Sequence, residues 1–390
     1  MTDIMQRDQS FVANTYKRFP VELDHGKGSL IYDIDEKPYI DMGSGIGVTA
    51  LGIADDDWVT AVTDQLSKLQ HTSNLYYTAP CGELAQQLCE RTGMKKVFFS
   101  NSGAEANECA IKTARKYAAE HKGADCYTIL TLVNSFHGRT VTTLAATGQD
   151  TFHRQFLPLT DGFVYAPAND FDALKATAET HNLAAVMVEC VQGEGGVLPL
   201  DLTYLQKTAQ YCRDHDILLI VDEVQTGNGR TGTLYAYEQY GVTPDIVTTA
   251  KGLGGGLPIG ATLFGDKCEN TLGFGEHGST FGGNPVACAG ALAVLNKLDD
   301  TLLANVRRKS AYIFDQLENA KGVLSVSGKG LMIGIETVRP AADVVRDCMA
   351  RGVLCLTAKT KVRLLPALTI SDELLEQAIT TIKTVCGEGI

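Results

Sequence analysis

Two residues in this sequence, Lys251 and Asp222, could do chemistry together. Lys251 ends the mostly apolar run 246–250 and precedes the glycine-rich segment 252–260, and Asp222 ends the apolar run 217–221. A buried lysine is unfavourable unless its amine is used, and such an amine condenses with a carbonyl cofactor to form a Schiff base. A nearby carboxylate can pair with a ring nitrogen of the cofactor and hold its proton. The pair predicts a carbonyl-cofactor enzyme, with a strand-edge or helix-capping acid as the alternative for Asp222.

The segment Asn-Ser-Gly-Ala-Glu at 101–105 opens a predicted helix. Ser102 and Glu105 have the spacing of a capping box, and apolar residues follow near the helical period. The free backbone N–H groups at the start of this helix and the helix dipole would suit a phosphate group. A capped helix without a ligand is the alternative.

Three other segments carry side chains suited to a planar or anionic ligand. Phe136, in Phe-His-Gly-Arg, could stack on a planar ring or belong to the core. The loop 278–285, rich in glycine and hydroxyl groups, could donate to a second anionic group or be a flexible connection. Arg363 lies within an apolar strand and needs a partner, either a substrate carboxylate or an acidic side chain.

The segment 227–232 matches the pattern GxGxxG of dinucleotide-binding proteins. That motif requires its first glycine directly after a strand and a helix directly after the motif. Gly227 instead follows Asp222 at a distance, and the residues after Gly232 are poor helix starters. We therefore predict no nicotinamide site here.

The elements that must position these residues alternate between strands and helices. Strands are predicted at 97–100, 127–133, 185–189, 217–221 and 246–249, and each is followed by polar or glycine-rich residues. Ligands bind outside the carboxyl ends of strands in open α/β sheets, so these ends predict one shared site. The predicted fold class is α/β, with a mostly parallel central sheet and helices on both faces.

The C-terminal third has a different pattern of predicted helices and strands. Helices are predicted at 287–298 and 301–321, and short strands at 330–336 and 361–365, which together indicate a smaller α+β domain. We predict a large cofactor-binding domain over residues 61–284. Residues 1–60 and 285–390 are predicted to form the smaller domain together.

Composition excludes several classes of function. The 390 residues carry a formal net charge of −12 without a basic run, which argues against nucleic acid or an anionic membrane as partner. The 11 cysteines are scattered, without the spacing of a metal site or a disulfide framework. The N-terminus lacks the apolar core of a signal peptide, so a cytoplasmic protein is expected.

Several of these segments, taken together and in order, resemble the class III (ornithine-type) pyridoxal-phosphate aminotransferases of fold type I. The resemblance covers nearly the whole chain and rests on 101–107, 136–140, 189–194, 222–232, 249–261 and 278–285. The segments 47–52 and 71–77 resemble the acetylornithine group within this family. The chain departs from the family at 53–58, where histidine and proline usually follow the glycine, and we expect this to affect the start of a helix.

The resemblance implies pyridoxal 5'-phosphate as the cofactor and no metal. Lys251 would form the Schiff base and shuttle a proton, while Asp222 would pair with the pyridine nitrogen. The cofactor-binding set that it implies is Ser102, Gly103, Ala104, Phe136, Asp222, Glu223, Val224, Gln225, Lys251 and Thr280. Thr280 would reach the cofactor of the partner subunit, which implies a homodimer with shared active sites.

The resemblance also implies transfer of the δ-amino group of N-acetylornithine to 2-oxoglutarate, a step of arginine biosynthesis. The substrate-binding residues would be Arg139, Glu194, Ser279 and Arg363. Glu194 would pair with Arg363 while the amino donor is bound and release it for the dicarboxylate. Succinylornithine, ornithine or 4-aminobutyrate as the donor is the alternative, and a nicotinamide-dependent dehydrogenase is a more distant one.

Overall fold

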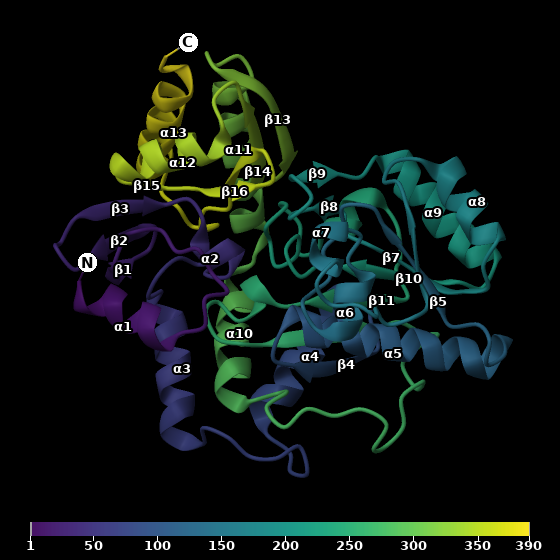
Figure 1. Ribbon diagram of the computed structural model, residues 1–390. Helices are drawn as coiled ribbons and strands as arrows, with labels where there is room; N and C mark the ends of the chain where they lie inside the picture. The colour runs from purple at the N-terminus through teal and green to yellow at the C-terminus, as the bar shows by residue number, and fades with distance from the viewer. Residues whose placement is uncertain (1, 390) are drawn as a thin grey trace.

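The computed structural model describes residues 2–389 and shows two lobes (Figure 1). The larger lobe is built on a seven-stranded sheet. In spatial order its strands are β4 (Lys96–Ser100), β12 (Gly260–Phe264), β11 (Ile246–Thr249), β10 (Leu218–Asp222), β7 (Leu183–Val188), β5 (Thr128–Leu132) and β6 (Phe163–Ala166). Only β12 runs against its neighbours, because it pairs antiparallel with both β11 and β4. The predicted α/β class with a mostly parallel sheet is confirmed.

Helices cover both faces of this sheet. Side chains of a strand point alternately to its two sides, so each strand can pack against the helices on both faces. On β10, Leu218 and Ile220 pack with the residues of α5 (Gly103–Lys122). The alternate residues Leu219 and Val221 belong to the core that includes α9 (Leu202–Asp214) and α4 (Ala79–Thr92). The central strands are therefore buried on both sides, as their apolar runs indicate.

All five predicted strands of the sheet exist, with ends that differ by at most two residues from the predicted ones. The sequence analysis missed β12 and β6. Each is short, and β12 begins at Gly260 within a glycine-rich segment, which hides a strand from pattern reasoning. The antiparallel direction of β12 follows from its short connection to β11, since a parallel crossover needs a longer segment.

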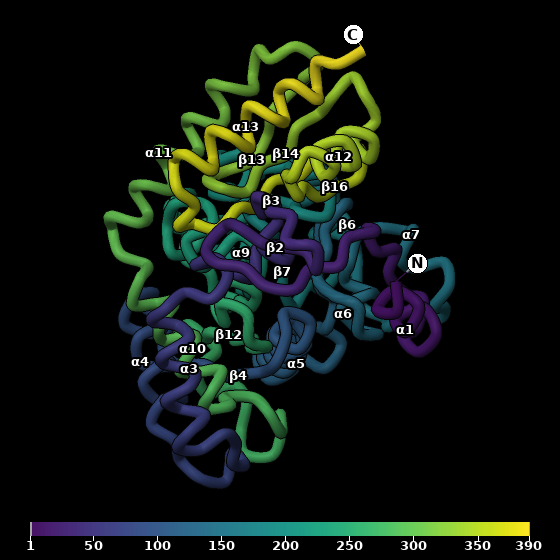
Figure 2. The backbone as a smooth tube through the Cα atoms, turned by 90° about the vertical axis from the view of Figure 1, so that its left-hand side faces the viewer, coloured from purple at the N-terminus to yellow at the C-terminus, as the bar shows by residue number. Residues whose placement is uncertain are grey.

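The smaller lobe contains two four-stranded sheets. The first has the order β1 (Leu23–Lys27), β2 (Leu30–Asp33), β3 (Pro38–Asp41) and β15 (Val353–Leu354), and the second has the order β13 (Val323–Lys329), β14 (Met332–Thr337), β17 (Lys361–Leu364) and β16 (Leu356–Ala358). Pairing of β3 with β15 is parallel, so strands from both ends of the chain lie side by side (Figure 2). The helices of this lobe include α11 (Asp300–Leu317), α12 (Ala341–Ala350) and α13 (Asp372–Gly387). The division of the chain into domains stays a prediction.

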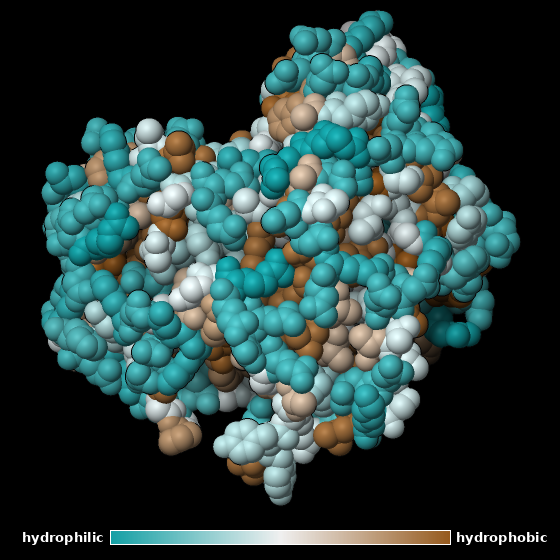
Figure 3. Space-filling view, turned by 180° about the vertical axis from the view of Figure 1, so that it is seen from behind, coloured by the Kyte–Doolittle hydropathy of each residue, from teal (hydrophilic) through white to brown (hydrophobic). Residues whose placement is uncertain are grey.

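The remaining elements connect or cover these sheets. They are α1 (Asp3–Phe11), α2 (Ser44–Gly47), α3 (Asp56–Lys68), α6 (Val141–Ala146), α7 (Asp150–His153), α8 (Phe171–Glu179), α10 (Pro285–Lys297), the short strands β8 (Val191–Gln192) and β9 (Leu198–Pro199), and the 3₁₀ turns η1 (Ala236–Tyr240) and η2 (Lys251–Leu253). Hydrophilic residues cover much of the face seen from behind, with hydrophobic residues exposed between them (Figure 3). Within residues 2–389, no helix has both the length and the apolar character to cross a membrane.

Candidate active site

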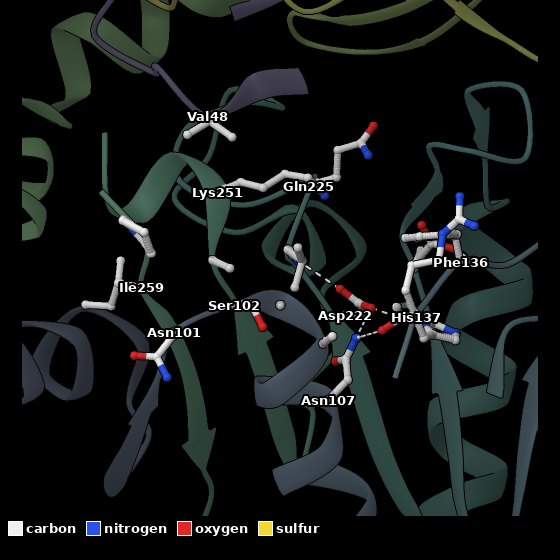
Figure 4. A pocket seen from close by; sticks show the side chains of 18 of the residues that line it. Val48, Asn101, Ser102, Asn107, Phe136, His137, Asp222, Gln225, Lys251 and Ile259 are labelled. Carbon is white, nitrogen blue, oxygen red and sulfur yellow. Dashed lines mark hydrogen bonds and ion pairs between the residues drawn. The ribbon is translucent and has the colours of Figure 1, made fainter. Parts of the chain in front are cut away.

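The carboxyl ends of the strands surround a cavity of about 430 Å³ (Figure 4), a size typical of small-molecule sites. Nine of the residues predicted for the site line it: Ser102, Gly103, Ala104, Phe136, Arg139, Asp222, Val224, Gln225 and Lys251. They follow β4, β5, β10 and β11, so segments distant in sequence meet at one edge of the sheet. The predicted convergence of strand ends is thus what the structure shows.

Lys251 lies at the start of η2, directly beyond β11, and extends between Val48 and Gln225 (Figure 4). Among residues 2–389 its amine has no hydrogen-bond partner, and the residue is half-buried in the cavity wall. This burial lowers the pKa of Lys251 below its ordinary value, although Asp222, Glu194 and Glu189 act in the opposite direction. A larger neutral fraction makes the amine a better nucleophile.

The backbone of Lys251 is strained, because its φ is 42°. Such a left-handed conformation in a non-glycine residue costs on the order of 1–3 kcal/mol and persists only where the surroundings impose it. The turn that follows imposes it here, since the N–H of Gly254 donates to the carbonyl of Lys251 at 3.1 Å.

Asp222, at the carboxyl end of β10, is 4% exposed and accepts three hydrogen bonds. Oδ2 accepts from Nδ2 of Asn107 and Nδ1 of His137, both at 2.8 Å, and Oδ1 accepts from the N–H of Val224 at 3.0 Å. These donors fix the orientation of the carboxylate at the cavity floor.

Asn107 and His137 form a polar layer behind Asp222 that the sequence analysis did not assign to the site. The amide of Asn107 also donates to the carbonyl of His137 at 2.7 Å and accepts from Thr248 Oγ1 at 2.7 Å. Burial by itself would lower the pKa of His137, but its hydrogen bond to Asp222 and the charges of Asp222 and Glu189 raise it overall. A polar Asn107 within the buried stripe of α5 was the signal available in the sequence.

Glu189, directly after β7, is a second buried carboxylate of the cavity wall. Its oxygens accept the N–H groups of Phe136 at 2.9 Å and Gly193 at 3.4 Å. Burial raises the pKa of Glu189 to about 7, because neither the charge of His137 nor these bonds fully compensate it. This carboxyl group therefore changes its charge near neutral pH and connects two loops of the site.

The N-terminus of α5 points into the cavity from the end of β4 (Figure 4). Ser102 caps this helix, since its hydroxyl accepts the N–H of Glu105 at 3.2 Å. The predicted capping box is only half formed, because the Glu105 carboxylate accepts the N–H of Asn101 at 2.7 Å instead. Gly103 is needed for close packing, since a Cβ there would lie 2.6 Å from a methyl of Val224. The unpaired N–H groups of this first turn form an anion seat.

Arg363, on β17 of the smaller lobe, lies beside the cavity, where it contacts the lining residue Gln225, and it is 3% exposed. Its Nη1 donates to Glu194 Oε1 at 2.5 Å and to Gln225 Oε1 at 3.4 Å, while its buried Nε has no partner within residues 2–389. Burial alone would raise the pKa of Glu194, but the charge and hydrogen bond of Arg363 hold it below the ordinary value. The guanidinium is thus paired, with donor capacity left for a second carboxylate.

Phe136 and Arg139 form one aromatic and cationic corner of the cavity. The guanidinium of Arg139 lies 5.6 Å from the ring centroid of Phe136 and 4.2 Å from that of Phe152. The two phenylalanine rings meet edge to face, with centroids 5.8 Å apart. These contacts hold an exposed cation beside a ring that faces the cavity.

Five predicted residues, Glu194, Glu223, Ser279, Thr280 and Arg363, do not line this cavity, although Glu194 and Arg363 both contact its lining residue Gln225. Glu223 points to the opposite side of β10 and is buried, where it accepts from Thr226 Oγ1 at 2.5 Å and from the N–H of Tyr237 at 2.8 Å. It follows Asp222 directly, so the alternation of side chains along a strand places it away from the site. Ser279 and Thr280 lie on a loop beside a separate surface hollow.

The segment 227–232 does not have the structure that a dinucleotide-binding motif requires. After β10, the segment 223–235 runs as turns, and the first helical element beyond it is η1 (Ala236–Tyr240). The GxGxxG segment therefore opens no helix, as predicted. Within residues 2–389, no three residues among His, Cys, Asp and Glu gather as a metal site.

Comparison with known proteins adds an independent finding. Residues 11–386 match the family described as Aminotransferase class-III. The chain is 54% identical over 387 residues to the acetylornithine aminotransferase of Haemophilus ducreyi, covering 99% of this chain and 98% of the relative. It superposes on the ornithine aminotransferase of Toxoplasma gondii with a TM-score of 0.94 at 33% identity, covering 98% of this chain and 94% of that one. For the N-acetylornithine aminotransferase of Stenotrophomonas maltophilia the TM-score is 0.84 at 36% identity, with 98% of each chain covered.

Proposed function

Because this chain belongs to the class-III aminotransferases, we propose that it transfers the δ-amino group of N-acetyl-L-ornithine to 2-oxoglutarate. The products are N-acetylglutamate semialdehyde and L-glutamate. The observation that carries the choice of donor is the 54% identity to an acetylornithine aminotransferase over nearly the whole of both chains. Transfer to 2-oxoglutarate agrees with a buried arginine at the edge of the cavity.

The enzyme uses pyridoxal phosphate, and the residues of the cavity fit this cofactor. The cavity is lined by an amine without a hydrogen-bond partner, a buried carboxylate and an aromatic ring. The N-terminus of a capped helix also reaches it. When bound, the cofactor supplies an aldehyde that reacts with amines and a ring that accepts electrons from the substrate's reacting carbon. Lys251 would hold the aldehyde, Gly103 and Ala104 would seat the phosphate, and Phe136, Val224 and Gln225 would bind the ring.

We assign proton chemistry to two side chains. Lys251, with its lowered pKa, is the base that takes a proton from the reacting carbon of the donor and returns one to the acceptor. Asp222, which its three hydrogen bonds hold in place, would pair with the ring nitrogen of the cofactor and keep a proton there. Asn107 and His137 keep Asp222 in place from behind.

Arg363 and Glu194 would allow one site to accept two different substrates. While the donor is bound, Glu194 would neutralise Arg363. When 2-oxoglutarate enters, its carboxylate takes the place of Glu194 on the guanidinium. Arg139, exposed beside Phe136, would bind the carboxylate of the donor.

We further propose a cytoplasmic homodimer. Ser279 and Thr280, the substrate- and cofactor-binding residues that lie outside the cavity of their own chain, would complete the site of the partner subunit. The loops at this end of the molecule expose large apolar side chains, among them Leu75, Tyr76, Tyr77 and Phe274, as expected of an interface. All eleven cysteines are free thiols, which suits a reducing compartment.

The domain division over 61–284, with 1–60 joined to 285–390, also stays our proposal. It is supported by the pairing of β3 with β15, which places strands from both terminal segments in one sheet. Arg363 comes from the smaller unit and Lys251 from the larger, so the proposed site would lie where the two meet.

A panel of amino donors tests the proposal. Purified enzyme is assayed with 2-oxoglutarate and either acetylornithine, succinylornithine, ornithine or 4-aminobutyrate, and glutamate formation is measured. We expect the highest kcat/KM with acetylornithine. Ornithine is the second candidate, favoured by the TM-score of 0.94 to an ornithine aminotransferase, and a higher kcat/KM with ornithine would replace our assignment.

A further inference from the structure

The single tryptophan of the chain, Trp58, packs against the turn that follows Lys251. Trp58 lies in the first turns of α3, and its indole Nε1 donates to the carbonyl of Gly254 at 3.0 Å. The same carbonyl accepts the N–H of Leu257 at 3.3 Å, so two donors hold it. No other side chain of residues 2–389 donates to this carbonyl.

The indole also fills the space beside the turn. A Cβ at Gly255, where φ is 61°, would lie 2.7 Å from Nε1, and a Cβ at Gly290 of α10 would lie 2.9 Å from the same atom. The ring therefore occupies a narrow slot between the turn and α10. A side chain at either glycine would displace it.

This turn connects Trp58 to the reacting amine. Gly254 donates its N–H to the carbonyl of Lys251, and Gly256 and Leu257 line the cavity beside the lysine. The positive φ of Lys251 persists only while the turn holds its shape. A displacement of Gly254 would thus be passed to the Lys251 backbone over three residues.

Trp58 is itself held firmly. Asp55, the N-cap of α3, accepts the N–H of Trp58 at 3.2 Å. Lys297 of α10 donates to the Asp55 carboxylate at 2.7 Å and lies 2.9 Å from that of Asp57. These two acids, from the segment 53–58, thus connect the start of α3 to α10.

We propose that Trp58 is a positioning residue for Lys251, acting through the Gly254–Gly256 turn. The indole N–H fixes the carbonyl at which the chain turns, and the ring limits the movement of the two glycines that follow. The inference rests on the proposed function only in that Lys251 holds the cofactor. It does not depend on which amino donor is used.

The test replaces the N–H group of the indole while keeping the shape of the ring system. Because the chain has one tryptophan, biosynthetic incorporation of benzothienyl-alanine, in which sulfur replaces the N–H, alters this position alone. Trp58→Phe is the genetic counterpart. The matched control is Val62→Ala, since Val62 lies one turn further along α3, faces Gly290 and has no indole N–H to donate to Gly254.

The main readout is the visible spectrum of the cofactor-loaded enzyme as a function of pH. We expect both tryptophan replacements to shift the pH at which the visible spectrum is halfway between its two forms. We also expect them to lower kcat by about two- to tenfold with little change in KM, as for loss of one neutral hydrogen bond. Val62→Ala should leave the midpoint in place. Unchanged spectra and kcat in the benzothienyl-alanine protein, or an equal shift in the Val62 control, would overturn the inference.

These results separate the two proposals. If the wild-type enzyme fails to use acetylornithine but shows the visible band, the proposed donor is wrong and the titration still tests Trp58. If the wild type uses acetylornithine and the replacements change nothing, only the role of Trp58 is refuted.

Discussion

Replacing Glu194 by glutamine should change the two half-reactions in opposite directions. Glu194 is the acidic partner of Arg363, whose side chain is 4% exposed, while that of Glu194 is 31% exposed. Glutamine keeps the size and an acceptor oxygen but removes the charge that competes with an incoming carboxylate. The acceptor should therefore bind more easily, and the donor should meet an uncompensated cation.

The magnitude follows from the strength of the bond that is exchanged. A hydrogen bond to a charged group contributes about 1.5–3 kcal/mol and a neutral one about 0.5–1.5 kcal/mol. The substitution thus weakens the bond of residue 194 to Arg363, which competes with 2-oxoglutarate, by about 1–1.5 kcal/mol. This corresponds to a roughly five- to tenfold lower KM for 2-oxoglutarate. The donor half-reaction should slow by a similar factor. Because Glu194 is partly exposed, we expect a loss of only about 1 kcal/mol in stability, well below the loss for a fully buried pair.

The stability difference should depend on pH in a defined direction. The folded-state pKa of Glu194 is lowered, so the stability that it contributes is present above its ordinary pKa. This contribution is lost as the pH falls through the lowered value. The wild type and Glu194→Gln should therefore differ in unfolding free energy at neutral pH, and the difference should shrink as the pH falls below the ordinary glutamate pKa of about 4.3.

Single-turnover spectra of the bound cofactor measure each half-reaction by itself. Glu189→Gln is the matched control, because Glu189 lines the same cavity without contacting Arg363 and should affect both half-reactions in the same direction. Equal changes of both half-reactions in Glu194→Gln would refute the reasoning, as would an unchanged KM for 2-oxoglutarate.

Three further predictions concern the buried charges of the site. Lys251→Ala should abolish the visible band of the cofactor while the thermal unfolding temperature of the cofactor-free protein is retained, and a surviving band would contradict its assignment. Asp222→Ala should lower kcat by at least about a hundredfold, since the ring proton loses its partner, and steady-state assays near wild-type turnover would exclude this role. Glu189 has a pKa raised to about 7, so its contribution to stability is complete below its ordinary pKa and is lost as the pH rises toward 7. Glu189→Gln should therefore flatten the dependence of the unfolding temperature on pH between about 4.5 and 7, and an unaltered slope would count against this pKa.

The sequence was most informative where local pattern and chemistry coincide. Apolar runs that end in Asp222 or before Lys251 predicted both a strand and a functional side chain, because strand ends in such sheets carry ligands. Spacing also showed that the segment 227–232 opens no helix. These are short-range properties, and the structure agrees with them.

Other features depend on contacts that sequence spacing cannot show. Asn107 and His137 both donate to Asp222, but they lie on different elements and gain their role only in three dimensions. Glu223 was assigned to the cofactor with its neighbour Asp222, although the pleat directs it to the other face. Trp58 contacts Gly254 across nearly two hundred positions, so nothing local reveals it.

The parallel pairing of Ile40 with Val353 joins positions more than three hundred residues apart, and this has a consequence for biosynthesis. A ribosome adds about 5–20 residues per second, so β3 waits on the order of 15–60 s before its neighbour β15 emerges. Until then the three-stranded sheet β1–β3 has an open edge at β3, which can pair with strands of other chains. The seven-stranded sheet needs only residues 96–264 and can assemble earlier. Release of the nascent chain before residue 353 would leave a folded sheet beside an unprotected edge, which makes this interval the vulnerable period of the enzyme's production.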